Sequence, residues 1–176
     1  MNENPASRTG LRGWFRRQAD AYRNGNERPL TGYLALMSVY GTGTLGAVGL
    51  ARLLGRRAPK QLSPWDVAQL AVATQRLSRL IAKDPVTSPL RAPFTEYQGL
   101  SAPGELAEEV RGHGLQHSVG ELLTCPMCLA QWVATGFCAG LVLAPVPTRL
   151  ALATFTAVGG ADAMQYLYVR LQQATE

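Results

Sequence analysis

Three long apolar stretches restrict the folds open to this 176-residue chain more than any other feature. Each is close to the ~20 residues that an α-helix needs to cross ~30 Å of hydrocarbon. The first has no charge before Arg52, the second has none, and the third has only Asp162 after its leading Arg149. A soluble protein rarely buries three such stretches. We therefore predict transmembrane helices at residues 30–54, 122–144 and 148–169.

A fourth segment, residues 62–82, is less apolar because Asp66, Arg76 and Arg79 interrupt it. It either spans the membrane or lies on its surface. The distribution of arginine and lysine over the loops distinguishes the two arrangements, since these residues concentrate on the cytoplasmic side of a membrane protein. If the segment spans, ten of them fall inside and four outside; otherwise the asymmetry vanishes. We predict an all-α integral membrane bundle of four transmembrane helices in the cell membrane, with both termini cytoplasmic.

The predicted organisation has three parts. Residues 1–29 form a basic, mostly disordered cytoplasmic tail, and residues 30–55 form an accessory transmembrane helix. Residues 62–176 form a three-span core with a cytoplasmic loop at 83–121. That loop holds four prolines and six acidic residues, so we expect it to be partly extended, with a turn or two of helix at 105–111.

Membrane lipids are the partners that the charge pattern favours. The net charge is +5, and six of the fifteen arginines lie in the first 28 residues. Positive-inside bias explains such a tail, which can also touch anionic lipid, so nucleic acid is an unlikely partner. Gly41, Gly43, Gly46 and Gly49 lie in the first apolar stretch and permit close helix approach in lipid. A protein partner or a homo-oligomer through such glycine-rich helices is therefore a second expectation.

Cys125 and Cys128 stand where a polar loop meets the apolar stretch at 122–144. We predict Thr124 as the helix N-cap, which puts Cys125 and Pro126 in the first turn and Cys128 one turn later. Amide dipoles at a helix start favour the thiolate, whereas the nearby Glu121 opposes it. A redox-active pair is one hypothesis, although no βαβ pattern of a thioredoxin fold is present. Membrane thiol oxidases also need a second cysteine pair, and only Cys138 remains here.

A structural zinc site is another hypothesis for the same cysteines. His113 and His117 would complete four nitrogen and sulfur ligands with Cys125 and Cys128. Glycines around the histidines make a helix there less favourable, and solvated histidine side chains are the simpler interpretation. The sequence predicts no cofactor, with this zinc ion as the one possibility.

Asp162 is a carboxylate inside a predicted span, where an ionisable side chain usually faces a partner or water. We expect it to pair with Arg76 or Arg79, which lie at a similar depth on residues 62–82. The simpler interpretation is a buried pair that fixes helix register, and the alternative is a proton or substrate relay.

Several motifs together resemble those of a known family. They are the arginine- and leucine-rich helix end at 76–80, the run at 84–94 that ends in Arg-Ala-Pro-Phe, and Gly-Glu-Leu-Leu-Thr-Cys-Pro-Met-Cys at 120–128 followed by Trp132. Over residues 62–176 the chain resembles a bacterial family of unknown function, made of short integral membrane proteins with a Cys-x-x-Cys-x-x-x-Trp motif, some of them associated with sporulation. The family often has glycine where this chain has Ala130. The resemblance implies a membrane fold and marks Glu121 and Trp132, but implies no reaction.

Taken together, the sequence favours a non-enzymatic structural, interaction or sensing role at the inner leaflet. A membrane thiol-disulfide exchanger or redox sensor using Cys125 and Cys128 is the alternative, and a structural zinc site is the second alternative.

Overall fold

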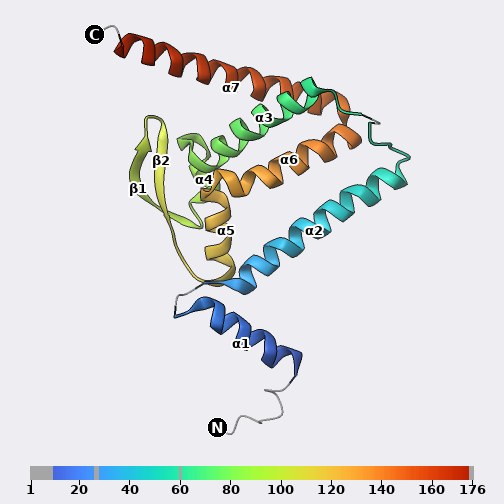
Figure 1. The fold of residues 1–176 in the computed structure, drawn as a ribbon, viewed down its shortest axis with the longest axis vertical. Helices are drawn as coiled ribbons and strands as arrows, with labels where there is room; N and C mark the ends of the chain where they lie inside the picture. Colours follow the sequence, from blue (N-terminus) through green and yellow to red (C-terminus); the bar gives the residue numbers. More distant parts are fainter. Residues whose placement is uncertain (1–9, 26–27, 60, 175–176) are drawn as a thin grey trace.

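The computed structural model describes residues 10–25, 28–59 and 61–174, and the chain in these ranges is mostly helical (Figure 1). A small two-stranded sheet accompanies the helices, so the predicted all-α class holds only for the bulk of the fold. The elements in order are α1 (Leu11–Arg23), α2 (Leu30–Leu53), α3 (Pro64–Lys83), the 3₁₀ turn η2 (Pro85–Thr87), α4 (Ser88–Arg91), β1 (Thr95–Ala102), β2 (Glu105–Val110), α5 (Gly114–Thr124), α6 (Pro126–Leu143) and α7 (Pro145–Gln173).

Helices α3, α6 and α7 pack together around a small apolar core. The start of α3 is set by a capping box, in which the Ser63 side chain and the Asp66 side chain each accept the other's backbone N–H. Ala73, Phe137 and Leu152 form the buried centre, one from each helix. Thr156 Oγ1 on α7 also donates to the Gln69 carbonyl oxygen of α3 at 3.1 Å. These three helices make the bundle on which the rest of the chain is built.

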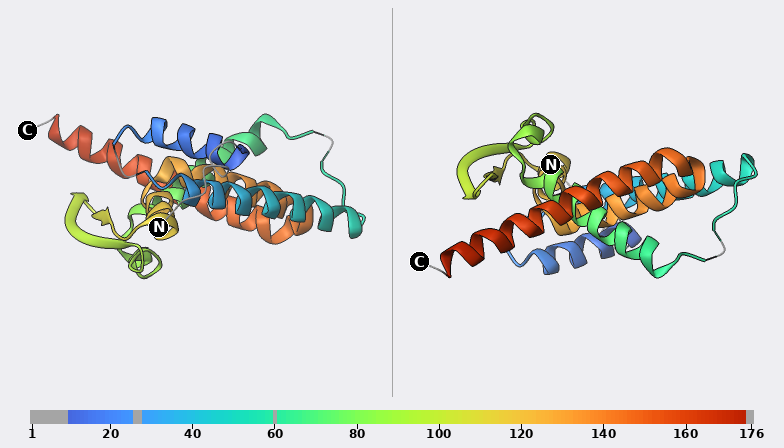
Figure 2. Two further views of the ribbon diagram at one scale, coloured as in Figure 1. Left: turned by 90° about the horizontal axis from the view of Figure 1, so that it is seen from below. Right: turned by 90° about the horizontal axis from the view of Figure 1, so that it is seen from above.

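Helix α2 contacts the bundle mainly at its beginning, where it lies on α5. Gly32 allows this, because an added Cβ would meet Ser118 Oγ at 2.2 Å and the Gly114 carbonyl oxygen at 2.9 Å. In Figures 1 and 2 the rest of α2 runs alongside α6, which it contacts through Tyr40. No described atom lies within 4 Å of a Cβ added at the four glycines predicted to allow close helix approach, Gly41, Gly43, Gly46 and Gly49. Close approach within the chain therefore depends on Gly32, and helix association through the other four stays a prediction.

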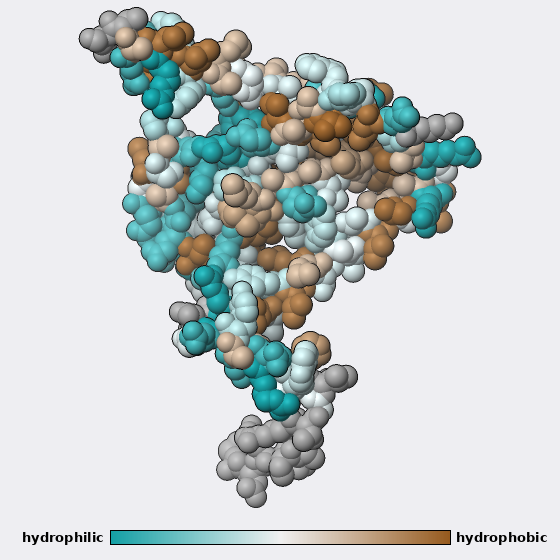
Figure 3. All heavy atoms as spheres, viewed as in Figure 1, coloured by the Kyte–Doolittle hydropathy of each residue, from teal (hydrophilic) through white to brown (hydrophobic). Residues whose placement is uncertain are grey.

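The connector at 83–121 is folded. Strands β1 and β2 form an antiparallel hairpin with irregular register near Gly99 and Ala102. The helix expected at 105–111 is wrong, since residues 105–110 form β2: glutamate and alanine favour helix locally, but Pro103 and Gly104, with φ +77° at the glycine, make a tight turn. Figure 3 shows this side of the molecule as hydrophilic, whereas hydrophobic residues gather over the bundle helices.

The N-terminal tail contains a helix within the segment predicted to be mostly disordered. Helix α1 ends at Asn24, whose left-handed φ of 44° is typical of a helix C-cap. Trp14 and Phe15 are exposed, and their rings meet edge to face at 5.0 Å. Arg16 and Arg17 follow these aromatics directly and fall on the other side of the helix, so α1 is amphipathic.

Two helices, α2 and α6, are long and apolar enough to cross a membrane, judged by length and composition. Two helix starts differ from the predictions by three or four residues, and α7 extends to Gln173, four residues beyond its predicted end. Helix α6 starts at Pro126 instead of 122, and α7 starts at Pro145 instead of 148, because both prolines take the first helical position, where a missing N–H costs nothing.

Candidate functional site

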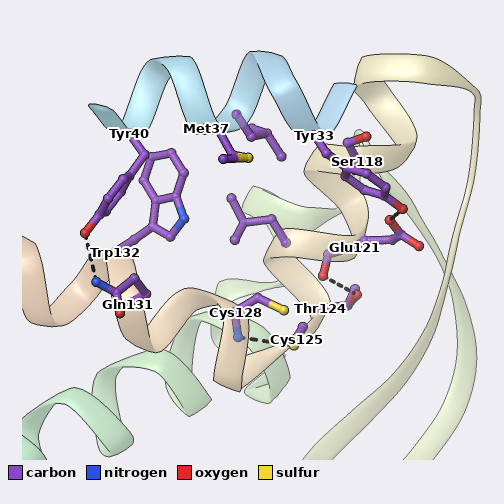
Figure 4. Close-up of a pocket in the computed structure, with 12 residues that line it drawn as sticks. Tyr33, Met37, Tyr40, Ser118, Glu121, Thr124, Cys125, Cys128, Gln131 and Trp132 are labelled. Carbon is purple, nitrogen blue, oxygen red and sulfur yellow. Dashed lines mark hydrogen bonds between the residues drawn. The ribbon is translucent and has the colours of Figure 1, made fainter. Parts of the chain in front are cut away.

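A cavity of about 710 Å³ lies between α2, α5 and α6, and both motif cysteines line it (Figure 4). Its walls are mostly apolar. The lining residues come from α2 (Tyr33, Leu36, Met37, Tyr40), from α5 (Ser118, Glu121, Leu122, Thr124) and from the start of α6 (Cys125, Cys128, Gln131, Trp132). The cavity thus collects Cys125, Cys128, Glu121 and Trp132, four residues singled out from the sequence, beside residues of α2 about 90 positions earlier.

The two cysteines stand at a break between helices. Pro126 disfavours a helical conformation at Cys125, which has φ −102° and ψ 104° and separates α5 from α6. Cys125 itself is the N-cap, and its Sγ accepts the backbone N–H of Cys128 at 3.2 Å. The prediction that Thr124 is the N-cap is therefore wrong: Thr124 ends α5, and its hydroxyl donates to the Gly120 carbonyl oxygen at 2.9 Å.

Glu121 is surrounded by donors at one end of the cavity. The Tyr33 hydroxyl donates to Glu121 Oε2 at 2.5 Å, and Arg28 Nη1 donates to Oε1 at 3.1 Å. His117 Nε2 lies 3.5 Å from the same Oε1. Arg28 places a positive charge beside this carboxylate, and the contacts join the start of α2 to α5.

The other end of the cavity is closed by contacts between α2 and α6. The rings of Tyr40 and Trp132 meet edge to face, with centroids 5.2 Å apart. Gln131 Nε2 donates to the Tyr40 hydroxyl at 2.8 Å, and Thr135 Oγ1 lies 2.8 Å from that hydroxyl. The Trp132 position, marked by motif alone, is thus an interhelical contact.

The proposed zinc ligands do not form one group. His113 precedes the first residue of α5, whereas His117 lies one turn into the helix beside Glu121. Within the described ranges, no three histidine, cysteine, aspartate or glutamate side chains come together as a metal site would need. Zinc binding stays a prediction, and it would require Cys125, Cys128 and the two histidines to approach one another.

A second polar cluster joins α3 to α7. Arg76 Nε lies 2.9 Å from Asp162 Oδ2, although the N–H is not aligned for a hydrogen bond, and Arg76 Nη2 donates to Asp84 Oδ2 at 3.2 Å. Arg79 instead pairs with Glu105 of the hairpin. The structure therefore places Arg76, and not Arg79, beside Asp162.

Arg91 is a structural residue that sequence reasoning did not single out, although it lies in the motif run at 84–94. Its side chain is fully buried and pairs with Glu108 of β2. Its Nη1 donates to the Ile81 carbonyl oxygen at 2.6 Å and to Thr87 Oγ1 at 2.7 Å, and its Nη2 donates to the Asp84 carbonyl oxygen at 3.1 Å. Arg91 thereby fixes the hairpin to the end of α3.

Comparison with known proteins assigns a family. A family described as proteins of unknown function, DUF1360, matches residues 69–168, which run from α3 into α7. The sporulation protein YjcA of Bacillus subtilis (strain 168) is 32% identical over 80 residues, which cover 44% of this chain and 64% of that relative. No solved structure matches. The predicted resemblance to a bacterial family with sporulation-associated members is confirmed. Because the match takes in more than half of the sequence, this chain belongs to the DUF1360 family of proteins of unknown function.

Proposed function

We propose that the protein is a multi-pass integral membrane protein that binds or senses a ligand at the inner leaflet and is not an enzyme. The exposure of its apolar helices carries this proposal. Only 6% of the most apolar window of α2 is buried, and only 11% of that of α6. Core helices of soluble proteins are mostly buried, whereas lipid tails cover such surfaces at no cost.

The directions of the long helices support four spans. Helices α2, α3, α6 and α7 alternate in direction, so the hairpin, α1 and α5 all lie toward one end and the short connections toward the other (Figure 1). The amphipathic α1 carries aromatic and basic side chains, as helices at a membrane interface do. We place this end at the cytoplasmic side, with α3 and α7 as spans beside α2 and α6.

Labelling of single cysteines tests this topology. In a variant without native cysteines, Ser63→Cys should react with a membrane-impermeant maleimide added outside intact cells. Ser101→Cys and Ser88→Cys should react only after the membrane is permeabilised. Labelling of Ser63→Cys and Ser101→Cys from the same side would refute the four-span arrangement.

The relationship to a sporulation protein is compatible with this role. The matched relative is a sporulation protein by name. The match covers 64% of its length, a little less than two thirds. A part in sporulation is therefore a proposal for this chain.

A thiol-disulfide exchanger or redox sensor is the second candidate. The observation in its favour is the bond from the Cys128 N–H to Cys125 Sγ, since hydrogen bonds to sulfur favour the thiolate. A cysteine introduced at Ser101 is the control, because that position is exposed on the hairpin, whereas Cys138 lies midway along the proposed span α6. Under mildly acidic conditions Cys125 should react with iodoacetamide faster than Ser101→Cys. Equal rates across the pH range would exclude redox activation.

The zinc alternative has a direct test. Metal analysis of detergent-purified protein should find close to one zinc per chain, and both Cys128→Ser and His117→Ala should lose it. Absence of zinc from the native protein would remove this alternative.

A further inference from the structure

The cavity between α2, α5 and α6 has the size and lining of a small-molecule site. Its volume of about 710 Å³ falls within the roughly 300–1,000 Å³ that is usual for such sites, and its walls combine leucine, methionine and aromatic side chains with few polar groups. Leu36 and Met37 line the cavity from α2, and Figure 4 shows Met37 across the cavity from Cys128.

Most polar groups in the lining are already engaged with protein. Tyr33 donates to Glu121, and Ser118 and Thr124 donate to backbone carbonyl oxygens one turn earlier on α5. Tyr40 is bonded to Gln131 and to Thr135. The interior therefore offers little to a charged ligand, because the Glu121 carboxylate already has its own cation, Arg28.

The indole N–H of Trp132 is different. It has no acceptor within the part of the chain that the structure describes, and Figure 4 shows its nitrogen directed into the cavity. The position of the ring is fixed by its edge-to-face contact with Tyr40. A donor in an apolar pocket gains a net hydrogen bond only when a ligand brings an acceptor.

We infer that this cavity binds a neutral, lipid-soluble molecule that places a carbonyl oxygen on the Trp132 N–H and its apolar body against Leu36 and Met37. The inference deepens the proposed function and rests on it: with α2 and α6 as membrane spans, the cavity that they line would be open to lipid-soluble molecules. In that arrangement the ligand would reach the cavity from the bilayer. Glu121 is the one charged residue of the lining and is paired with Arg28, so the cavity favours a neutral carbonyl compound over a phospholipid, whose phosphate the Glu121 carboxylate would repel.

Protection of Cys128 from alkylation measures occupancy, because this exposed thiol lines the cavity. The probe is methyl nonyl ketone, and undecane, with the same number of carbons, lacks only the carbonyl. In detergent-purified protein with Cys128 as the single cysteine, the ketone should slow alkylation at lower concentration than undecane. A matched protein with Cys138 as the single cysteine should gain no protection.

Two variants test the contacts. Trp132→Phe keeps an aromatic ring but removes the N–H donor. It should weaken binding of the ketone by roughly 2- to 10-fold, the value of one hydrogen bond, and leave binding of undecane unchanged. Leu36→Phe should fill the cavity and reduce protection by both compounds, whereas Leu34→Phe, the same change on an exposed part of α2, should not.

The inference is overturned if ketone and undecane protect equally, if Trp132→Phe binds the ketone as the native protein does, or if Cys138 is protected equally well. It is also overturned if the ketone gives no protection because a phospholipid co-purifies in the cavity. Binding is measured in detergent and does not depend on orientation in a membrane. Its failure is thus distinct from failure of the topology test.

Discussion

Replacement of Arg91 tests whether the hairpin is fixed to the bundle by a buried ion pair. Arg91 is fully buried, and the side chain of its partner Glu108 is only 6% exposed. The guanidinium also donates to the carbonyl oxygens of Ile81 and Asp84 at the end of α3, which accept from Thr87 as well. Arg91→Met fills much of the same volume but removes every one of these donors.

The expected loss is large because Arg91→Met leaves a buried carboxylate unpaired. Breaking a buried ion pair by removing one partner typically costs about 3 to 5 kcal/mol. For a chain of this size each kcal/mol lowers the melting temperature by about 2 to 4 °C, so the expected decrease is about 6 to 20 °C. Adding Glu108→Leu to the variant should restore part of this loss, since no charge is then left buried.

Arg79→Met is the control, because Arg79 also pairs across to the hairpin, with Glu105, but is 44% exposed. Exposed pairs contribute about 0 to 1 kcal/mol, which corresponds to at most about 4 °C. Thermal unfolding in detergent, followed by near-ultraviolet circular dichroism, measures all four proteins under one condition. The reasoning is refuted if Arg91→Met lowers the melting temperature no more than Arg79→Met, or if Glu108→Leu destabilises the Arg91→Met variant further.

Two further predictions concern helix contacts. Asp162→Asn should destabilise the bundle. A double-mutant cycle should show a coupling energy of about 0.5 to 3 kcal/mol with Arg76→Gln but none with Arg79→Gln, since only Arg76 lies beside Asp162. If the effects are additive with both arginines, no such pair exists. Gly32→Ala should destabilise the folded protein by about 1 to 3 kcal/mol, because the added Cβ would overlap Ser118. Gly49→Ala, with open space around it, should be close to neutral. Equal effects of the two changes in unfolding experiments would contradict the packing of α2 on α5.

The helices were predictable because long apolar runs have few alternatives to a helix, and predicted boundaries differ by only a few residues from those of α2, α3 and α7. The hairpin was not predicted, because its strand residues include glutamate, alanine and glycine, which have low β propensity. Its signal was the Pro103-Gly104 turn. Helix α1 was missed because a short polar segment gains its helical pattern only when the spacing of Trp14 and Phe15 relative to the arginines is considered.

The candidate site could be predicted only in part. Cys125, Cys128, Glu121 and Trp132 were found because they form one local motif, and the structure brings all four to one cavity. The opposite wall, from Tyr33 to Tyr40, lies far away in sequence, and an apolar helix face carries no signal for the cavity that it covers. The sequence likewise could not decide whether Arg76 or Arg79 is the partner of Asp162, because both arginines lie within one turn of α3.

The break at Cys125 makes α5 and α6 two separate helices with different directions (Figure 1). Pro126 has no N–H with which to continue the hydrogen bonds of α5, so α6 begins as a new helix at this residue. On one face α5 fits the hairpin through Gly120, where an added Cβ would meet Val110 Cγ1 at 2.5 Å, and on another it holds α2 at Gly32. Because α5 lines the cavity and also supports the hairpin, a ligand that displaced α5 would alter the shape of the cavity and the position of the hairpin together.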